Sequence, residues 1–154
     1  MQLYLVQHGQ AKSEDVDPDR HLTEKGQNDV KKISFFLKKY GLSVDAIWHS
    51  GKTRAAQTAD ILASGVVVNQ AIAQHDGLKP NDAIGPLREE LVKADEDLMI
   101  VGHLPFLSKL ASAIVANSES ADVITFQQGG IVCLEQNEEL AWSIRWMVIP
   151  ELLP

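Results

Sequence analysis

Short apolar runs alternate with helical periodicity along the first two thirds of the chain. The run from Gln2 to Val6 ends at His8-Gly9, which is typical of a buried strand closed by a tight turn. Three more short strands are predicted, over residues 45–49, 66–68 and 97–101. The apolar runs are too short for helices, so they are interpreted as the strands of a central sheet.

Helices are predicted between these strands. After Thr23, whose side chain suits an N-cap, apolar residues recur at helical spacing until Gly41 ends the segment. Three further helices are expected to begin near Ser50-Gly51, Asn81 and Pro105, and to end near Gly65, Lys93 and Asn117.

The last third of the chain changes to short strands separated by turns. Strands are predicted over residues 123–126, 131–134 and 142–149, with Gly129-Gly130 and Asn137-Glu138 as the turn signals. Strand–helix alternation followed by a strand meander predicts one α/β domain over residues 1–154. We expect a three-layer α/β/α architecture with a mainly parallel sheet and an antiparallel C-terminal extension.

Composition narrows the classes of function. The 154 residues carry 14 Lys+Arg against 21 Asp+Glu, a net charge of −7, with no basic stripe that would bind nucleic acid. No apolar run approaches the roughly 18 residues of a membrane span, and the N-terminus resembles no secretory signal, so a cytoplasmic protein is expected. Cys133 is the only cysteine, which excludes an internal disulfide and a thiolate-rich metal site.

The residues with catalytic chemistry follow the predicted strands. His8 comes after the first strand, Ser50 after the second with Arg54 four residues on, and His103 after the fourth. Ligands of open α/β sheets bind outside the carboxyl ends of the strands. A single histidine in such a place is usually a packed structural residue, but three strands that deliver such groups to one edge favour a shared site.

Three motifs at this edge resemble the histidine phosphatase superfamily, also called phosphoglycerate mutase-like. They are His8-Gly9, Ser50-x-x-x-Arg54-Ala55-x-Gln57-Thr58-Ala59 and Gly102-His103-x-Pro105. Arg20-x-Leu22-Thr23-x-x-Gly26 is also similar to the family's entry into its first helix. The short chain and the order of its segments resemble the SixA-like group of phosphohistidine phosphatases.

The resemblance implies a mechanism. His8 would attack phosphorus in line and become a phosphohistidine, which water then hydrolyses. His103 and Arg54 would surround the phosphoryl oxygens, with neither metal nor cofactor. The implied substrate is phosphohistidine on a protein or another small phosphorylated compound. A mutase would need longer insertions than this chain has.

One position departs from the family pattern. Gln7 stands where the family has arginine, and its amide can donate only a neutral hydrogen bond to phosphate. An uncompensated loss of this arginine would cost about 10²–10³ in rate, by analogy with an oxyanion-hole donor. The alternative function is therefore a catalytically impaired phosphate- or phosphoprotein-binding module on the same scaffold. Gln7→Arg is expected to raise turnover.

The remaining candidates complete the predicted site. Arg20 matches the family's loop arginine and is expected to bind phosphate, as are Gln7 and Gly9. Asp76, which precedes Gly77-Leu78-x-Pro80, is the predicted general acid, although an ordinary turn carboxylate is an equal alternative. An imidazole leaving group needs such an acid less than an alkoxide does. No cluster of aspartates that would hold a metal is expected.

Overall fold

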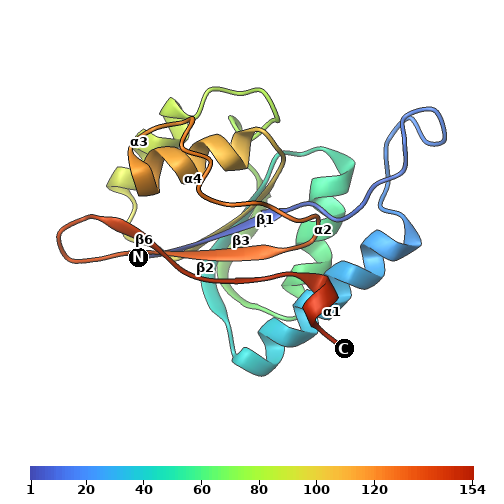
Figure 1. Cartoon of the computed structure of the whole chain (residues 1–154). Helices are drawn as coiled ribbons and strands as arrows, with labels where there is room; N and C mark the ends of the chain where they lie inside the picture. The colour runs from blue at the N-terminus through green and yellow to red at the C-terminus, as the bar shows by residue number, and fades with distance from the viewer.

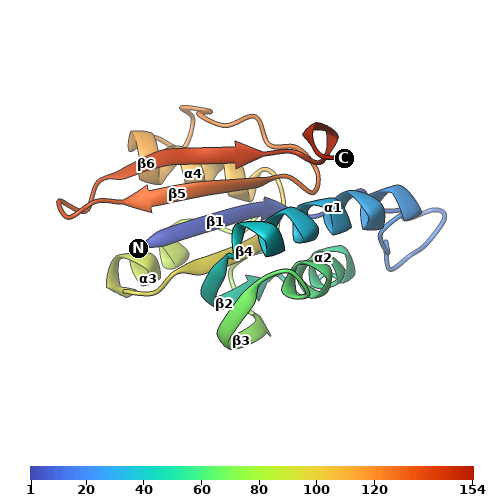
Figure 2. The ribbon, with the colours of Figure 1, turned by 90° about the horizontal axis from the view of Figure 1, so that it is seen from below.

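Six strands form a single sheet in the computed structural model, which describes residues 1–154. The strand order is β3-β2-β4-β1-β5-β6 (Figure 2). The strands are β1 (Gln2–Gln7), β2 (Ser43–His49), β3 (Val67–Gln74), β4 (Leu98–Gly102), β5 (Ile131–Gln136) and β6 (Trp142–Val148). Strands β3, β2, β4 and β1 run parallel, while β5 is antiparallel to β1 and β6 to β5. The predicted mainly parallel sheet with an antiparallel C-terminal extension is confirmed.

Helices cover both faces of this sheet. They are α1 (Glu24–Tyr40), α2 (Thr53–Ala63), α3 (Gly85–Lys93) and α4 (Phe106–Ala116), and a short 3-10 helix η1 (Pro150–Leu152) follows β6. Helices α3 and α4 lie on one side of the sheet and α1 and α2 on the other (Figure 1). Each pair buries its apolar stripe against the sheet in a separate core cluster, which gives the predicted three layers. No helix has both the length and the apolar character needed to cross a bilayer.

Local sequence signals set the ends of α1. The Thr23 hydroxyl accepts a hydrogen bond from the Gly26 N–H, as an N-cap does, and Gly41 ends the helix with φ of 80°. Gly26 also permits a close approach, because a Cβ there would lie 2.1 Å from the Gln10 carbonyl oxygen. The first turn of α1 therefore packs directly on the backbone that leaves β1.

Two expectations about secondary structure are wrong. Residues 123–126 form no strand, because the segment packs over the α3/α4 face of the sheet instead of joining an edge. Ile124 and Phe126 are nevertheless buried in the α3/α4 core, which explains the strand-like alternation. Asn81 caps no helix, since the Asp82 carboxylate accepts from the Lys79 N–H in a turn and α3 begins only at Gly85.

Candidate active site

Three parallel strands bring their terminal residues together at one edge of the sheet. His8 follows β1, Ser50 follows β2 and His103 follows β4, and all three are buried. The rings of His8 and His103 lie 5.0 Å apart between centroids. Arg54, in the first turn of α2, directs its Nε–H toward His8 Nε2 at 3.4 Å. The structure thus joins the two histidines and the arginine that the sequence pointed to.

The backbone sets the protonation of the His8 ring. His8 Nδ1 lies 2.7 Å from the Gly9 carbonyl oxygen, and because that oxygen can only accept, Nδ1 carries the proton. The lone pair is therefore on Nε2, which faces Arg54. Burial lowers the pKa of His8 from 6.5 to about 4, against the opposing effect of the Gly9 hydrogen bond. At neutral pH the ring is an uncharged nucleophile.

His103 has the opposite arrangement. Ser50 Oγ accepts the Lys52 N–H at 3.3 Å and lies 2.6 Å from His103 Nε2. We assign the Ser50 hydroxyl as the donor in this bond, because the opposite direction would leave both the hydroxyl proton and His103 Nδ1 without a partner. The proton of the neutral His103 ring is then on Nδ1, which is buried and has no partner in the protein. Burial, followed by the charges of His8 and Arg54 among others, lowers the pKa of His103 to about 3. His103 Nδ1–H is thus a free donor beside the His8 nucleophile.

Arg54, which contacts His8, also lines a cavity that holds two further cations. A cavity of about 420 Å³ is lined by Arg20, Lys52 and Arg54 together with the carboxylates of Glu14 and Asp19, and no hydrophobic residue faces it. Desolvation, and next the charge of Arg20, lowers the pKa of Arg54. A chain with a net charge of −7 therefore holds a locally cationic pocket.

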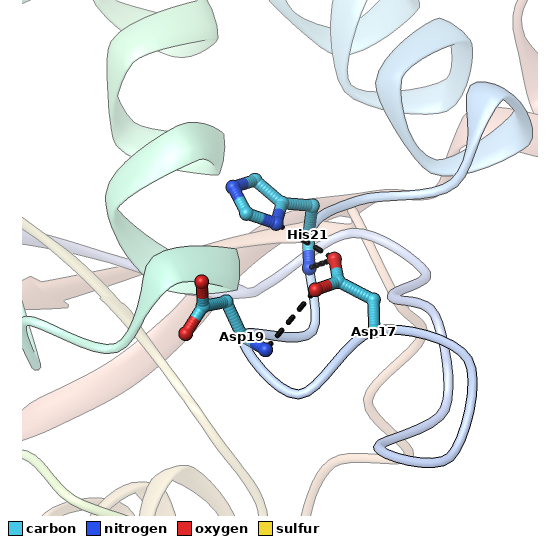
Figure 3. A group of neighbouring side chains, drawn as sticks. All are labelled: Asp17, Asp19 and His21. Atoms are coloured by element: carbon cyan, nitrogen blue, oxygen red, sulfur yellow. Dashed lines mark hydrogen bonds and ion pairs between the residues drawn. The ribbon is translucent and has the colours of Figure 1, made fainter.

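A hydrogen-bonded loop holds Arg20 at this cavity. Arg20 has φ of 53°, and its Nε–H donates to the Lys12 carbonyl oxygen. Asp17 fixes the same turn, because its carboxylate accepts from the N–H groups of Asp19 and His21 and from the His21 ring (Figure 3). These bonds, the His21 N–H first, lower the pKa of the Asp17 carboxyl.

The same loop bears on the expectation that no cluster of aspartates would hold a metal. Asp17, Asp19 and His21 have ligand atoms within 4.8 Å of one another, so the chain does bring two aspartates and a histidine together. The Asp17 carboxylate, however, is already engaged by the loop's own N–H groups (Figure 3). We interpret the cluster as the structural support of Arg20.

The arginine-containing motif on α2 also fastens the loop after β1. Thr58 Oγ1 accepts the Gly9 N–H at 3.0 Å, and Gln57 Oε1 accepts the Leu22 N–H at 2.7 Å. Both polar groups of Gly9 are therefore engaged, one by Thr58 and the other by the His8 ring. The phosphate-binding role expected of Gly9 stays a prediction, and the structure gives it a positioning role.

Gln7 does not line the cationic cavity. Its side chain lines a second cavity of about 580 Å³, and its Oε1 is buried without a hydrogen-bond partner. Asp76 follows β3 and is exposed; its backbone oxygen contacts the His75 ring, but no contact joins its carboxylate to His8, His103 or Arg54. Its role as general acid stays a prediction.

The arrangement suits transfer of a phosphoryl group. A neutral nitrogen nucleophile, a guanidinium and an N–H donor without a protein partner lie together at one edge of the sheet. Such positioning and charge stabilisation make up most of phosphoryl-transfer catalysis. Sequence reasoning found Ser50 as part of a motif but missed its hydrogen bond to His103. It also missed Asp17, whose spacing from Arg20 and His21 was the available signal.

Comparisons with known proteins agree with this geometry. The sequence model of the histidine phosphatase superfamily (branch 1) matches residues 3–83. An uncharacterised protein of Picosynechococcus sp. (strain PCC 7002) is 33% identical over 142 residues, which cover 87% of this chain and 84% of that protein.

Solved structures show the same fold. The protein histidine phosphatase SixA in complex with tungstate superposes with a TM-score of 0.86 at 18% identity, covering 99% of both chains. Phosphoserine phosphatase from Entamoeba histolytica, in complex with 3-phosphoglyceric acid, superposes with a TM-score of 0.70 at 15% identity, covering 95% of both.

Proposed function

Because the chain belongs to the histidine phosphatase superfamily (branch 1), we propose that it hydrolyses phosphohistidine on a protein, or a small phosphomonoester, through a phosphohistidine intermediate at His8. The observation that carries this proposal is the His8 ring. Its Nδ1–H is held by the Gly9 carbonyl, and its Nε2 lone pair faces the Arg54 guanidinium. A buried neutral imidazole so oriented is a nucleophile aimed at a bound anion.

Two displacements complete the reaction. In the first, His8 Nε2 forms a bond to phosphorus while the bond to the leaving group breaks with its electron pair. The Nδ1–H···O=C bond of His8 stabilises the positive charge that its ring gains. In the second, water attacks phosphorus, the P–N bond breaks and His8 returns to its neutral form. The proposed chemistry uses no metal and no cofactor.

The donors divide between the phosphoryl oxygens. His103 Nδ1–H, the Arg54 guanidinium and the Arg20 guanidinium face the region where negative charge accumulates. Gln7 contributes its amide N–H as a neutral donor, and Asp76 is the proposed acid for substrates with an alkoxide leaving group. Arg20 and Lys52 supply further positive charge at the cavity that Arg54 lines.

A second candidate is a phosphate- or phosphoprotein-binding module that turns over poorly. The observation that favours it is Gln7, which supplies no positive charge where the family has arginine. Tight binding of vanadate or phosphate without hydrolysis supports this candidate. The intact His8 nucleophile favours the enzyme, because a binding site gains nothing from an attacking lone pair.

One assay tests both candidates. The wild type, His8→Ala and Gln7→Arg are incubated with a phosphohistidine-bearing domain and with para-nitrophenyl phosphate, and released phosphate is measured. We expect hydrolysis by the wild type and its loss in His8→Ala. Equal rates in the wild type and His8→Ala would refute the nucleophile assignment, and binding without hydrolysis by the wild type would favour the module.

A further inference from the structure

The cavity that Arg54 lines carries charges of both signs. Its lining includes three cations, Arg20, Lys52 and Arg54, and the two carboxylates of Glu14 and Asp19, with no hydrophobic residue among them. None of these five groups belongs to an ion pair, because the ion pairs of the protein join other residues. The cavity therefore presents positive and negative groups that do not neutralise one another by direct contact.

Two contacts place this cavity beside the catalytic histidines. Arg54 directs its Nε–H toward His8 Nε2 at 3.4 Å, so one side chain of the cavity wall reaches the nucleophile. The backbone N–H of Lys52 donates to Ser50 Oγ at 3.3 Å, and that hydroxyl contacts His103. A group bound in the cavity is therefore a neighbour of the phosphoryl group that the proposed reaction transfers to His8.

The two carboxylates oppose the binding of an anion, and the loop does not need them for its own structure. The hydrogen bonds of this loop that end on a carboxylate are all accepted by Asp17, and none by Glu14 or Asp19. Asp19 contributes only its backbone N–H, and its side chain points away from Asp17 toward α2 (Figure 3). Like charges repel, so carboxylates beside a phosphoryl group weaken its binding unless the ligand also brings a positive charge.

We infer that Glu14 and Asp19 bind a positive charge that the substrate carries next to its phosphoryl group. Arg54 and Arg20 then face the phosphoryl group, so that charges of both signs in the ligand meet opposite charges in one cavity. This inference rests on the proposed function and names the substrate class within it. The class is a phosphorylated compound that also carries an ammonium or guanidinium group. That group belongs to a lysine or arginine near a phosphohistidine in a polypeptide, or to the amine of a small phosphomonoester.

The carboxylates provide selectivity more than affinity. An ion pair at an exposed site changes an equilibrium by up to about fivefold, so two carboxylates account for a preference of about tenfold. The same carboxylates repel an acidic group in that place, so they act against one class of substrate as well as in favour of another. Salt should reduce the preference, because the cavity is open to solvent.

Matched substrates test the inference. Each peptide carries one phosphohistidine and one lysine, alanine or glutamate, placed in turn at each of the four positions on either side. At low salt, we expect the wild type to prefer lysine to glutamate about tenfold in kcat/KM at the best position, and less in about 0.5 M salt. A parallel comparison of 2-aminoethyl phosphate with ethyl phosphate shows whether the charge belongs to a small substrate instead.

Variants of the two carboxylates show whether they cause the preference. Glu14→Gln with Asp19→Asn should bring the lysine-to-glutamate ratio to within twofold of 1, and Glu14→Lys with Asp19→Lys should invert it. Hydrolysis of para-nitrophenyl phosphate, which has no positive charge, should rise in the Gln/Asn variant because repulsion is lost. Asp15→Asn is the matched control, since Asp15 is exposed in the same loop but does not line the cavity, and it should keep the wild-type ratio.

The outcomes separate this inference from the proposed function. Substrates of all charges hydrolysed within twofold of one another, or a lysine preference that persists in the Gln/Asn variant, overturn the inference while the phosphatase assignment stands. Calorimetry with His8→Ala measures the same preference as affinity, without turnover. If the wild type hydrolyses nothing, the proposed function fails, whereas tighter binding of the lysine peptide by His8→Ala, lost on Glu14→Gln with Asp19→Asn, still supports the inference.

Discussion

The ends of β1 and β4 each present a buried neutral histidine, yet the two rings are held by opposite nitrogens. At the end of β1, a backbone carbonyl holds Nδ1 of His8 and leaves the Nε2 lone pair toward Arg54. At the end of β4, the Ser50 hydroxyl holds Nε2 of His103 and leaves Nδ1–H without a partner. His8 is therefore a nucleophile and His103 a hydrogen-bond donor. In each case, the hydrogen bond made by one ring nitrogen determines the role of the other nitrogen.

The same comparison explains the burial of both rings. A protonated His8 would have no lone pair to attack phosphorus, and desolvation disfavours that form. His103 donates from Nδ1 in its neutral form, so burial does not impair its role as a donor. Burial also keeps water from competing for that donor. The shared burial thus serves two different roles.

The largest predicted difference between the two histidines concerns the covalent intermediate. His8→Ala should lower kcat/KM by about 10⁶-fold, as loss of a nucleophile does. His103→Ala should lower it by about 10²–10³, because one donor is lost while the nucleophile remains. Rapid quenching with labelled substrate should trap an acid-labile phosphoenzyme in His103→Ala and none in His8→Ala. Label retained by His8→Ala would contradict the assigned roles.

Arg54 should matter almost as much as His103. Arg54→Ala is expected to lower kcat/KM by about 10²–10³, with weaker inhibition by vanadate, because the guanidinium faces both His8 and the cationic cavity. Arg54→Lys should recover only part of the loss, since lysine lacks the forked donors. Arg88→Ala, on α3, is the control for the loss of one positive charge. Equal effects of Arg54→Ala and Arg88→Ala would exclude a direct role for Arg54.

The pH dependence of activity should distinguish His8 from a histidine with an ordinary pKa. With its pKa lowered to about 4, the His8 ring stays neutral down to about pH 5 and gains its proton as the pH falls through 4. Activity should then fall about tenfold per pH unit below 4, once the ionisation of the substrate is allowed for. Ring signals in NMR titrations give the protonation directly, and a midpoint near 6.5 for His8 would contradict its burial.

Because proton binding is linked to folding, the lowered pKa of His8 also makes the stability of the protein depend on pH. The unfolded chain binds the proton near pH 6.5, whereas the folded chain binds it only near pH 4. The contribution of His8 is thus fully present above pH 6.5 and is lost as the pH falls toward 4. The free energy of unfolding, measured in denaturant, should decrease across that window.

Ser50 tests whether the tautomer of His103 is important. Ser50→Ala removes the hydroxyl that donates to Nε2, so the proton can move from Nδ1 and the donor is lost from part of the molecules. We expect kcat to fall about tenfold with little change in KM, and Ser50→Thr to restore most of it. Nitrogen NMR should show the change of tautomer. Ser112→Ala is the matched control, since its buried hydroxyl has no partner.

The sequence predicted the parts of this site that topology determines. Parallel strands place their carboxyl ends at one edge, so His8, His103 and Arg54 were expected to meet. The segment 123–126 was predicted as a strand because its apolar residues alternate, but its buried side chains pack in the α3/α4 core and the segment pairs with no strand. The tautomers were beyond prediction, because they depend on where the Gly9 carbonyl and the Ser50 hydroxyl lie to within a few tenths of an ångström.

The smallest expected effect concerns the loop that carries Arg20. Asp17→Asn weakens the hydrogen bonds to the N–H and ring of His21 and loosens the turn, so Arg20 spends less time at the cationic cavity. KM should rise about threefold while kcat stays unchanged, because substrate binding loses part of the energy of one hydrogen bond. Asp15→Asn, in the same loop and exposed, is the control for charge. A fall in kcat with KM unchanged would mean that this loop takes part in the chemical step itself, as the ends of β1 and β4 do.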